Sequence, residues 1–164
     1  MKTRSYIGGF LASVVLGVLL LWLRSRYPLN PLVMVLAPMN NSAWEWSKLV
    51  FWPYLGGALV IWRGLPEGSS RGGHCVLLIL MPLLTVLLTW LCHIGGGWLW
   101  VAVLASGIVL YALVLRKKIW GGELLWYTLA ILLGIAYILF SVLPPFGGPF
   151  TDPGDVSVMA TIPY

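Results

Sequence analysis

The sequence predicts an all-α integral membrane protein: a bundle of about five transmembrane helices with one short interfacial or re-entrant segment. Hydrophobic residues make up 60% of the 164 residues and charged residues only 9%, whereas a soluble domain carries about 25% charged residues. The apolar residues form long runs, each close to the roughly 20 residues that a helix needs to cross a bilayer. Ten tryptophans fit this class, because indoles favour the level of the lipid headgroups.

Each expected span is an apolar run that charged or polar residues bound. Arg24, Arg63 and Arg116 end three of the runs abruptly. The first run has no clear cleavage site, so we expect a retained helix and not a signal peptide. Residues 1–164 form one transmembrane domain, with an outer tail over 144–164 and no soluble domain for independent chemistry. The expected spans cover about 5–23, 43–62, 75–93, 97–115 and 123–143.

The distribution of lysine and arginine predicts the orientation, since cytoplasmic loops carry an excess of these residues. Five spans would place seven basic residues on one side and three on the other, which favours a cytoplasmic N-terminus and an outer tail. The basic residues form no continuous patch, so we expect the lipid bilayer as partner and no nucleic acid. The seven are Lys2, Arg4, Arg63, Arg71, Arg116, Lys117 and Lys118, and the three are Arg24, Arg26 and Lys48.

The segment from Pro28 to Pro38 is too short to cross a bilayer, and prolines bound it. Asn40-Asn41-Ser42 follows, a strong signal for a helix N-cap. The segment is either an interfacial helix or a re-entrant dip above a cavity. In both interpretations it lies on the outer side, over the region of Glu45.

Small residues repeat at four-residue steps in three of the expected spans. Helices in lipid pack through such residues, because small side chains let the backbones approach. We therefore expect these stripes to be inter-helix faces and not ligand sites. They are Gly9, Ser13 and Gly17 in the first span, Ala102 and Ser106 in the fourth, and Ala130 and Gly134 in the fifth.

The first candidate site lies at the start of the second span. Asn41, Glu45, Lys48 and Trp52 follow one another at four-, three- and four-residue steps, so they share a helix face. One interpretation is structural: Asn41 or Ser42 caps the helix, and Lys48 pairs with Glu45 near the positive end of the helix dipole. The other is a ligand-binding site formed by Asn40, Asn41, Glu45, Lys48 and Trp52.

Other polar groups converge on the same expected side of the membrane. His93 ends the third span and Asp152 follows the fifth. With Glu45 they form a candidate catalytic set, in which Glu45 is the base, His93 the acid or ligand, and Asp152 the orienting carboxylate. No motif of a known hydrolase, metalloprotease or phosphate-binding loop is present. His74 belongs to the opposite end of the third span, about 28 Å of helix from His93.

The two cysteines, Cys75 and Cys92, lie on the third span about 25 Å apart along a helix. They cannot bond to each other, and we interpret them as small packing residues. Their spacing is not that of a metal site. We therefore expect no metal and no cofactor.

The stretch from Asn30 to Lys48 resembles a segment of an uncharacterised family of small bacterial multi-spanning membrane proteins. Members carry Pro-x-Asn-Glu-Ser-x-Trp-Glu-His-x-Lys before a span and a Pro-rich exit into Phe-x-Asp-Pro, as in Phe150-Thr151-Asp152-Pro153 here. The resemblance covers about 35 residues directly. It implies a bacterial cytoplasmic membrane and no assigned activity. Asn41 replaces the family's Glu and Trp46 its His, which argues against a metalloenzyme.

Three functions remain open from the sequence. The first is a non-enzymatic protein that binds a small solute or lipid at its outer face, as a transporter-like binder or as a subunit beside a partner membrane protein. Its grounds are the small size, the outer polar rim, and prolines at 53 and 82 that would kink two spans. The second is a membrane-embedded enzyme acting on a lipid or lipid-linked group. The third is a purely structural assembly subunit.

Overall fold

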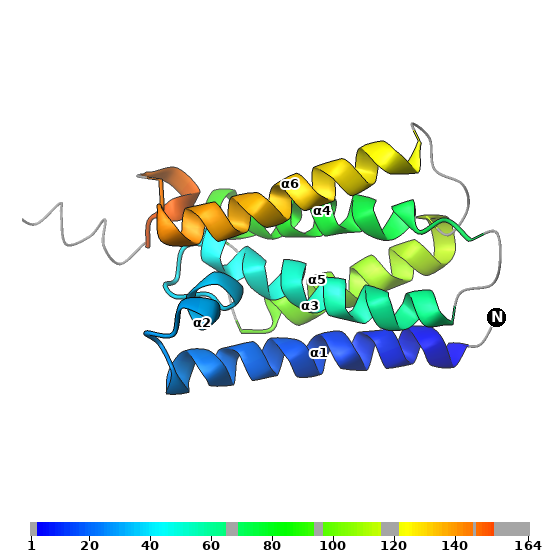
Figure 1. Cartoon of the computed structure of the whole chain (residues 1–164), viewed down its shortest axis with the longest axis horizontal. Coiled ribbons are helices and arrows are strands. Elements are labelled where there is room, and N and C mark those ends of the chain that lie inside the picture. The colour runs from blue at the N-terminus through cyan, green and yellow to red at the C-terminus, as the bar shows by residue number, and fades with distance from the viewer. Residues whose placement is uncertain (1–2, 65–68, 94–96, 116–121, 146, 153–164) are drawn as a thin grey trace, which may run out of the picture.

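The computed structural model describes residues 3–64, 69–93, 97–115, 122–145 and 147–152, and this part of the chain folds into helices without strands (Figure 1). The outer tail from residue 153, and the basic residues Lys2, Arg116, Lys117 and Lys118, lie outside the described residues. The α-helices are α1 (Thr3–Arg26), α2 (Pro31–Leu36), α3 (Ala43–Arg63), α4 (Gly72–Val86), α5 (Leu99–Leu110) and α6 (Glu123–Val142). The π-helices η1 (Leu87–Leu91) and η2 (Tyr111–Leu115) continue α4 and α5, and η3 (Gly148–Phe150) is a 3₁₀ turn.

Helices occupy all five ranges in which the sequence predicts spans. Three of them are long and apolar enough to cross a membrane, by length and composition: Arg4–Arg26, Gly72–Leu91 and Glu123–Val142. The Leu99–Leu115 helix is apolar but shorter, and α3 contains two charged side chains, Glu45 and Lys48, in its first two turns. The third helix ends at Leu91, so His93 lies beyond it.

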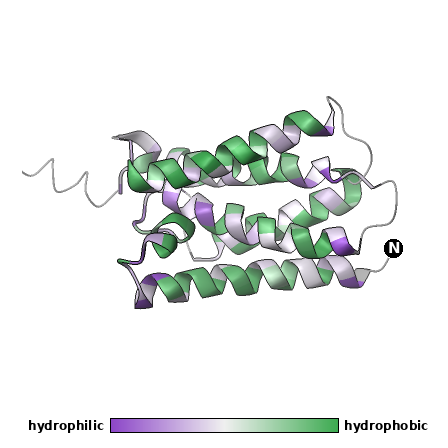
Figure 2. Cartoon of the chain, in the orientation of Figure 1, coloured by the Kyte–Doolittle hydropathy of each residue, from purple (hydrophilic) through white to green (hydrophobic). Residues whose placement is uncertain are grey.

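The long helices form a bundle in which α1 and α6 lie on opposite sides, with α3, α4 and α5 between them (Figure 1). Consecutive long helices run in opposite directions. The end of the bundle that holds α2, the start of α3 and η3 is called the Glu45 end, and the opposite end is called the Arg71 end. Hydrophilic residues concentrate at these two ends and at the start of α3, while the middle of the bundle is mostly hydrophobic (Figure 2).

The expected small-residue face of α1 is confirmed. A Cβ atom at Gly9 would lie 2.7 Å from Ile61 Cδ1 and 2.9 Å from the Gly57 carbonyl oxygen on α3, and one at Gly57 would overlap Ser13. Ser13 is fully buried and donates its hydroxyl to the Gly9 carbonyl at 3.0 Å. The backbones of α1 and α3 therefore touch without intervening side chains.

The other two small-residue stripes have mixed outcomes. On α6, Ala130 is buried, and a Cβ at Gly134 would contact the Phe51 ring at 3.4 Å, so this stripe faces α3. On α5, Ala102 is exposed, and Ser106 reaches α4 only through its hydroxyl, 3.9 Å from Met81 Sδ. The α5 prediction is thus wrong for Ala102, because Trp100, Val103, Leu104, Gly107 and Ile108 form the buried face of that helix.

The outward faces of the bundle are apolar. On α6 only Ala130 and Tyr137 are buried, and large side chains such as Ile131, Leu132 and Leu139 are more than half exposed. Water-soluble monomers rarely expose apolar surface on this scale. The apolar helices and the aromatic cluster described below are compatible with a membrane protein.

Candidate functional site

Glu45 and Lys48 form a buried ion pair at the start of α3. Lys48 Nζ lies 2.6 Å from Glu45 Oε1 and donates to Glu45 Oε2 at 2.8 Å. Lys48 is 0% exposed and Glu45 is 7% exposed. The three-residue spacing on a helix brings the two side chains onto one face, as the sequence predicts.

Backbone groups from outside α3 complete the hydrogen bonding of this pair. Lys48 Nζ also donates to the carbonyl oxygen of Met34 in α2 at 3.1 Å, and the Met39 amide donates to Glu45 Oε2 at 2.8 Å. Both carboxylate oxygens of Glu45 are therefore engaged. The Ser42 hydroxyl accepts from the Glu45 amide at 3.3 Å and caps α3, which decides between the two expected cap residues. The pair thus ties α2 and the 37–42 loop to α3.

The remaining predicted site residues do not join the ion pair. The Asn40 side chain accepts from the Ser42 amide at 2.9 Å, and the Asn41 amide donates to Asp152 Oδ2 at 3.0 Å. His93 is exposed, with a backbone φ of 52°, and neither a hydrogen bond nor an ion pair joins it to Glu45. Within the described ranges, no group of three or more His, Cys, Asp or Glu residues could hold a metal ion.

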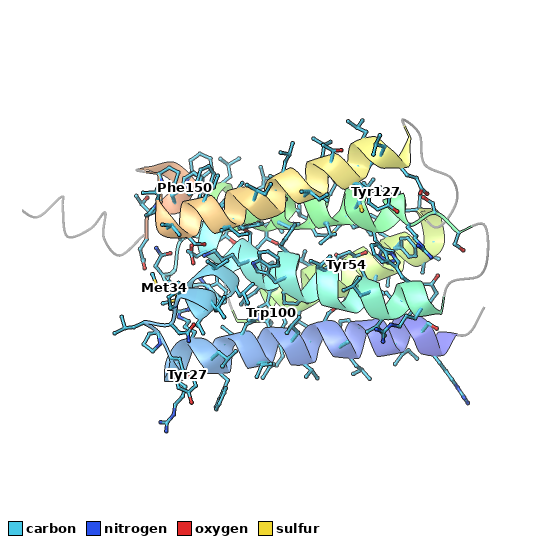
Figure 3. The ribbon with its side chains drawn as sticks, in the orientation of Figure 1. Tyr27, Met34, Tyr54, Trp100, Tyr127 and Phe150 are labelled. Carbon is cyan, nitrogen blue, oxygen red and sulfur yellow. The ribbon has the colours of Figure 1, made fainter. Side chains whose placement is uncertain are left out.

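Aromatic side chains cover the Glu45 end between α3 and α6. The Trp44 ring lies 4.6 Å from the Tyr137 ring and 5.0 Å from the Phe150 ring, measured between centroids. The Ser47 and Tyr137 hydroxyls lie 2.6 Å apart and share a hydrogen bond. Figure 3 shows Phe150 beside α6 at this end of the bundle. Helices α3 and α6 therefore contact each other here through these side chains.

Further along α3 and α6, toward the Arg71 end, a cavity of about 350 Å³ lies between the two helices. This volume is within the range of roughly 300–1,000 Å³ that is usual for ligand pockets. We call it the α3/α6 groove, with α4 as its floor. Its lining is almost entirely apolar. The lining residues are Phe51, Trp52, Leu55 and Trp62 of α3, Cys75 and Leu78 of α4, and Tyr127, Ala130, Ile131, Gly134, Ile135 and Ile138 of α6.

The groove is elongated along the bundle. Its α6 lining extends from Tyr127 to Ile138, which corresponds to about 16 Å of helix. One end is closed by Phe51, whose ring centroid lies 5.0 Å from that of Tyr137. Tyr127 marks the other end, on the half of α6 away from Phe150 (Figure 3). The indole N–H groups of Trp52 and Trp62 are buried without a hydrogen-bond partner in the described part of the chain.

Sequence reasoning identifies one residue of this groove, Trp52, and misses the rest. The available signal is the pair of small residues Ala130 and Gly134 on α6, which we interpret from the sequence as a packing face. They do face α3, but the gap beside them holds the cavity. The spacing between two helices is a property of the tertiary structure, and no local pattern encodes it.

His74 is a second buried polar group, near the Arg71 end. It is fully buried, its ring stacks on Tyr111 with centroids 3.6 Å apart, and its Nδ1 lies 2.9 Å from the Tyr54 hydroxyl. Its Nε2 has no partner among the described residues. The two cysteines are free, as the sequence predicts. Cys75 is buried, as expected of a packing residue, whereas Cys92 is exposed, so the packing interpretation is wrong for Cys92.

Neither protein-family models, nor curated proteins, nor solved structures match the chain.

Proposed function

We propose that this chain is a multi-pass protein of a bacterial cytoplasmic membrane that binds a lipid chain in the α3/α6 groove. The observation that carries the proposal is the cavity of about 350 Å³ with a nearly all-apolar lining. The side chains that flank it on α6, Ile131, Ile135 and Ile138, are exposed on the surface of the bundle. A chain from the surrounding bilayer can therefore enter the groove sideways.

The chemistry of the groove favours a lipid over a polar solute. Polar ligands need convergent hydrogen-bonding groups, since an unpaired polar group in an apolar pocket costs free energy. The groove offers few: the indoles of Trp52 and Trp62, the Cys75 thiol and the Tyr127 hydroxyl. An acyl chain gains roughly 0.8 kcal/mol per buried methylene relative to water, but nothing relative to bilayer. Selectivity must therefore come from shape and from groups at the ends of the groove.

The enzyme interpretation has less support. It needs Glu45 as a base, but both carboxylate oxygens of Glu45 accept hydrogen bonds from Lys48 or Met39. A general base must reach the proton that it removes within hydrogen-bonding distance. Glu45 is buried beneath the 34–39 segment, so we assign the ion pair to holding this end of the bundle together.

The membrane placement is part of the proposal. We infer that α3 and α5 cross together with the three longer apolar helices, because they pack among them, and that the Arg71 end faces the cytoplasm. The excess of lysine and arginine that the sequence assigns to that side of the membrane supports this orientation. The resemblance of the Asn30–Lys48 stretch to a bacterial membrane family is consistent with it. In this arrangement the groove opens toward the acyl chains of the cytoplasmic leaflet.

The test compares two substitutions on α6 that differ by three positions. Ile135 lines the groove, and Leu132 is similarly exposed but does not line it. We expect purified wild-type protein, after removal of loosely bound lipid, to retain one phospholipid per chain in native mass spectrometry. Ile135→Trp fills the groove and should abolish this retention, whereas Leu132→Trp should preserve it. Equal retention in both variants would overturn the proposal.

A further inference from the structure

The α3/α6 groove leads to a pair of opposite charges at the Arg71 end. Arg71 is the N-cap residue of α4. It precedes Cys75 by four residues and Leu78 by seven, and both Cys75 and Leu78 line the groove. Arg71 has helical backbone angles, so these three residues share a face. On α6, Glu123 precedes the groove residue Tyr127 by four. The α4 and α6 faces of the groove are therefore each followed, at the Arg71 end, by a charged residue.

Arg71 and Glu123 lie close together in the fold. The Ser70 hydroxyl donates to Glu123 Oε1 at 2.8 Å, and a Cβ at Gly72 would lie 3.1 Å from Glu123 Cγ. One chain neighbour of Arg71, Ser70, thus bonds to Glu123, and the other, Gly72, lies close beside it. Both charged side chains are exposed, and no ion pair joins them within the described residues. None of the described residues bonds to Glu123 Oε2 or to the guanidinium of Arg71, so both groups can bind a ligand.

We propose that the groove binds a phospholipid with a phosphoethanolamine headgroup, whose phosphate pairs with Arg71 and whose primary ammonium pairs with Glu123. This inference rests on the proposed function, and it adds the direction and the headgroup of the lipid. Arginine suits a phosphate, because the guanidinium offers two parallel N–H donors. A primary ammonium can donate hydrogen bonds to a carboxylate, which the quaternary ammonium of a choline headgroup cannot do.

The direction of the lipid follows from the two ends of the groove. The Glu45 end is closed by Phe51, Tyr137 and the hydrogen bond between Tyr137 and Ser47, so the tip of the chain lies there. Trp62 lines the groove, and its buried indole N–H has no hydrogen-bond partner among the described residues. As the last tryptophan of α3, one residue before its C-terminal Arg63, it lies toward the Arg71 end, where it can donate to an ester carbonyl of the lipid.

The experiment offers the full-length wild-type protein an equimolar mixture of phosphatidylethanolamine, phosphatidylglycerol and phosphatidylcholine with identical acyl chains. Native mass spectrometry then gives both the total lipid retained and the ratio of headgroups. We expect phosphatidylethanolamine to exceed both competitors. Glu123→Gln keeps an oxygen acceptor for Ser70 but removes the charge, and should lower the ethanolamine-to-glycerol ratio about two- to fivefold at unchanged total retention.

The matched control is Asp152→Asn, which makes the same change of charge at the Glu45 end and should leave the ratio unchanged. A wild-type preference for phosphatidylglycerol, or an equal fall of the ratio in both variants, would overturn the headgroup assignment. If Ile135→Trp still removes the lipid in that case, the lipid-binding function stands and only the headgroup assignment fails. Retention that Ile135→Trp does not reduce would overturn both.

Discussion

The Nζ atom of Lys48 donates a hydrogen bond of 3.1 Å to the carbonyl oxygen of Met34, fourteen residues earlier in the chain. A fully buried ammonium on α3 thereby holds the short helix α2 in place, while Glu45 neutralises its charge. A buried ion pair of this kind is costly to break from one side, because the remaining charge stays buried without a partner.

Lys48→Met should therefore be strongly destabilising. We expect the free energy of unfolding to fall by about 3–5 kcal/mol, the usual effect of removing one member of a buried pair. Chemical denaturation in detergent measures this change. The double variant Glu45→Gln/Lys48→Met should recover most of the loss, because no charge remains buried and the glutamine oxygen can still accept from the Met39 amide. Equal losses in the single and double variants would argue against this role of the pair.

Gly9→Ala should separate α1 from α3. The new methyl group would overlap Ile61 and the Gly57 backbone, and overpacking of this kind costs about 1–3 kcal/mol. The adjacent Gly8 is the matched control, since the nearest atom to a Cβ there is Val60 Cγ1 at 3.9 Å. Gly8→Ala should be neutral or slightly stabilising, because glycine weakens a helix. Thermal unfolding of both variants gives the comparison, and a similar effect of the two substitutions would contradict the close approach.

The hydrogen bond between Ser47 and Tyr137 should couple α3 to α6. A double-mutant cycle with Ser47→Ala and Tyr137→Phe is expected to give a coupling free energy of about 0.5–1.5 kcal/mol. Each variant keeps the aromatic contacts of Tyr137 with Trp44 and Phe51, so the cycle isolates the hydroxyl contact. Strict additivity of the two substitutions would show that the contact contributes nothing to stability.

The native cysteines provide a test of orientation. Cys92 is exposed and follows η1 at the Glu45 end, whereas Cys75 is buried. A membrane-impermeant maleimide added to intact bacterial cells or spheroplasts should label Cys92, and Cys92→Ser should abolish the labelling. Labelling that occurs only after the membrane is broken would place the Glu45 end in the cytoplasm and reverse the proposed orientation.

The sequence predicts those features that depend on neighbouring residues. The helices follow from the apolar runs, the cap from Ser42, and the Glu45–Lys48 pair from three-residue spacing. The sequence also predicts the α1 half of the contact between Gly9 and Gly57, because a stripe of small residues indicates a packing face.

Features that depend on long-range placement could not be predicted. The backbone groups of Met34 and Met39 that complete the ion pair carry no sequence signal, since every residue has them. The sequence groups His93 with Glu45 because each lies at the end of an expected span on the same side of the membrane. Two residues on the same side need not be in contact. The α3/α6 groove depends on how far two helices diverge after the Ser47–Tyr137 contact, and single-sequence periodicity does not report that distance.

The hydrogen bond from the Asn41 amide to Asp152 joins residues 111 positions apart, which has a consequence for synthesis. A ribosome adds about 5–20 residues per second, so Asp152 is synthesised roughly 6–22 s after Asn41. The delay between the synthesis of Ser47 and that of Tyr137 is almost as long. During this interval α1 and α3 can already pair through Gly9 and Gly57, but the Glu45 end stays incomplete. Closure of that end therefore has to wait until residues 137 and 152 have been synthesised, and a chain truncated before residue 137 lacks both contacts.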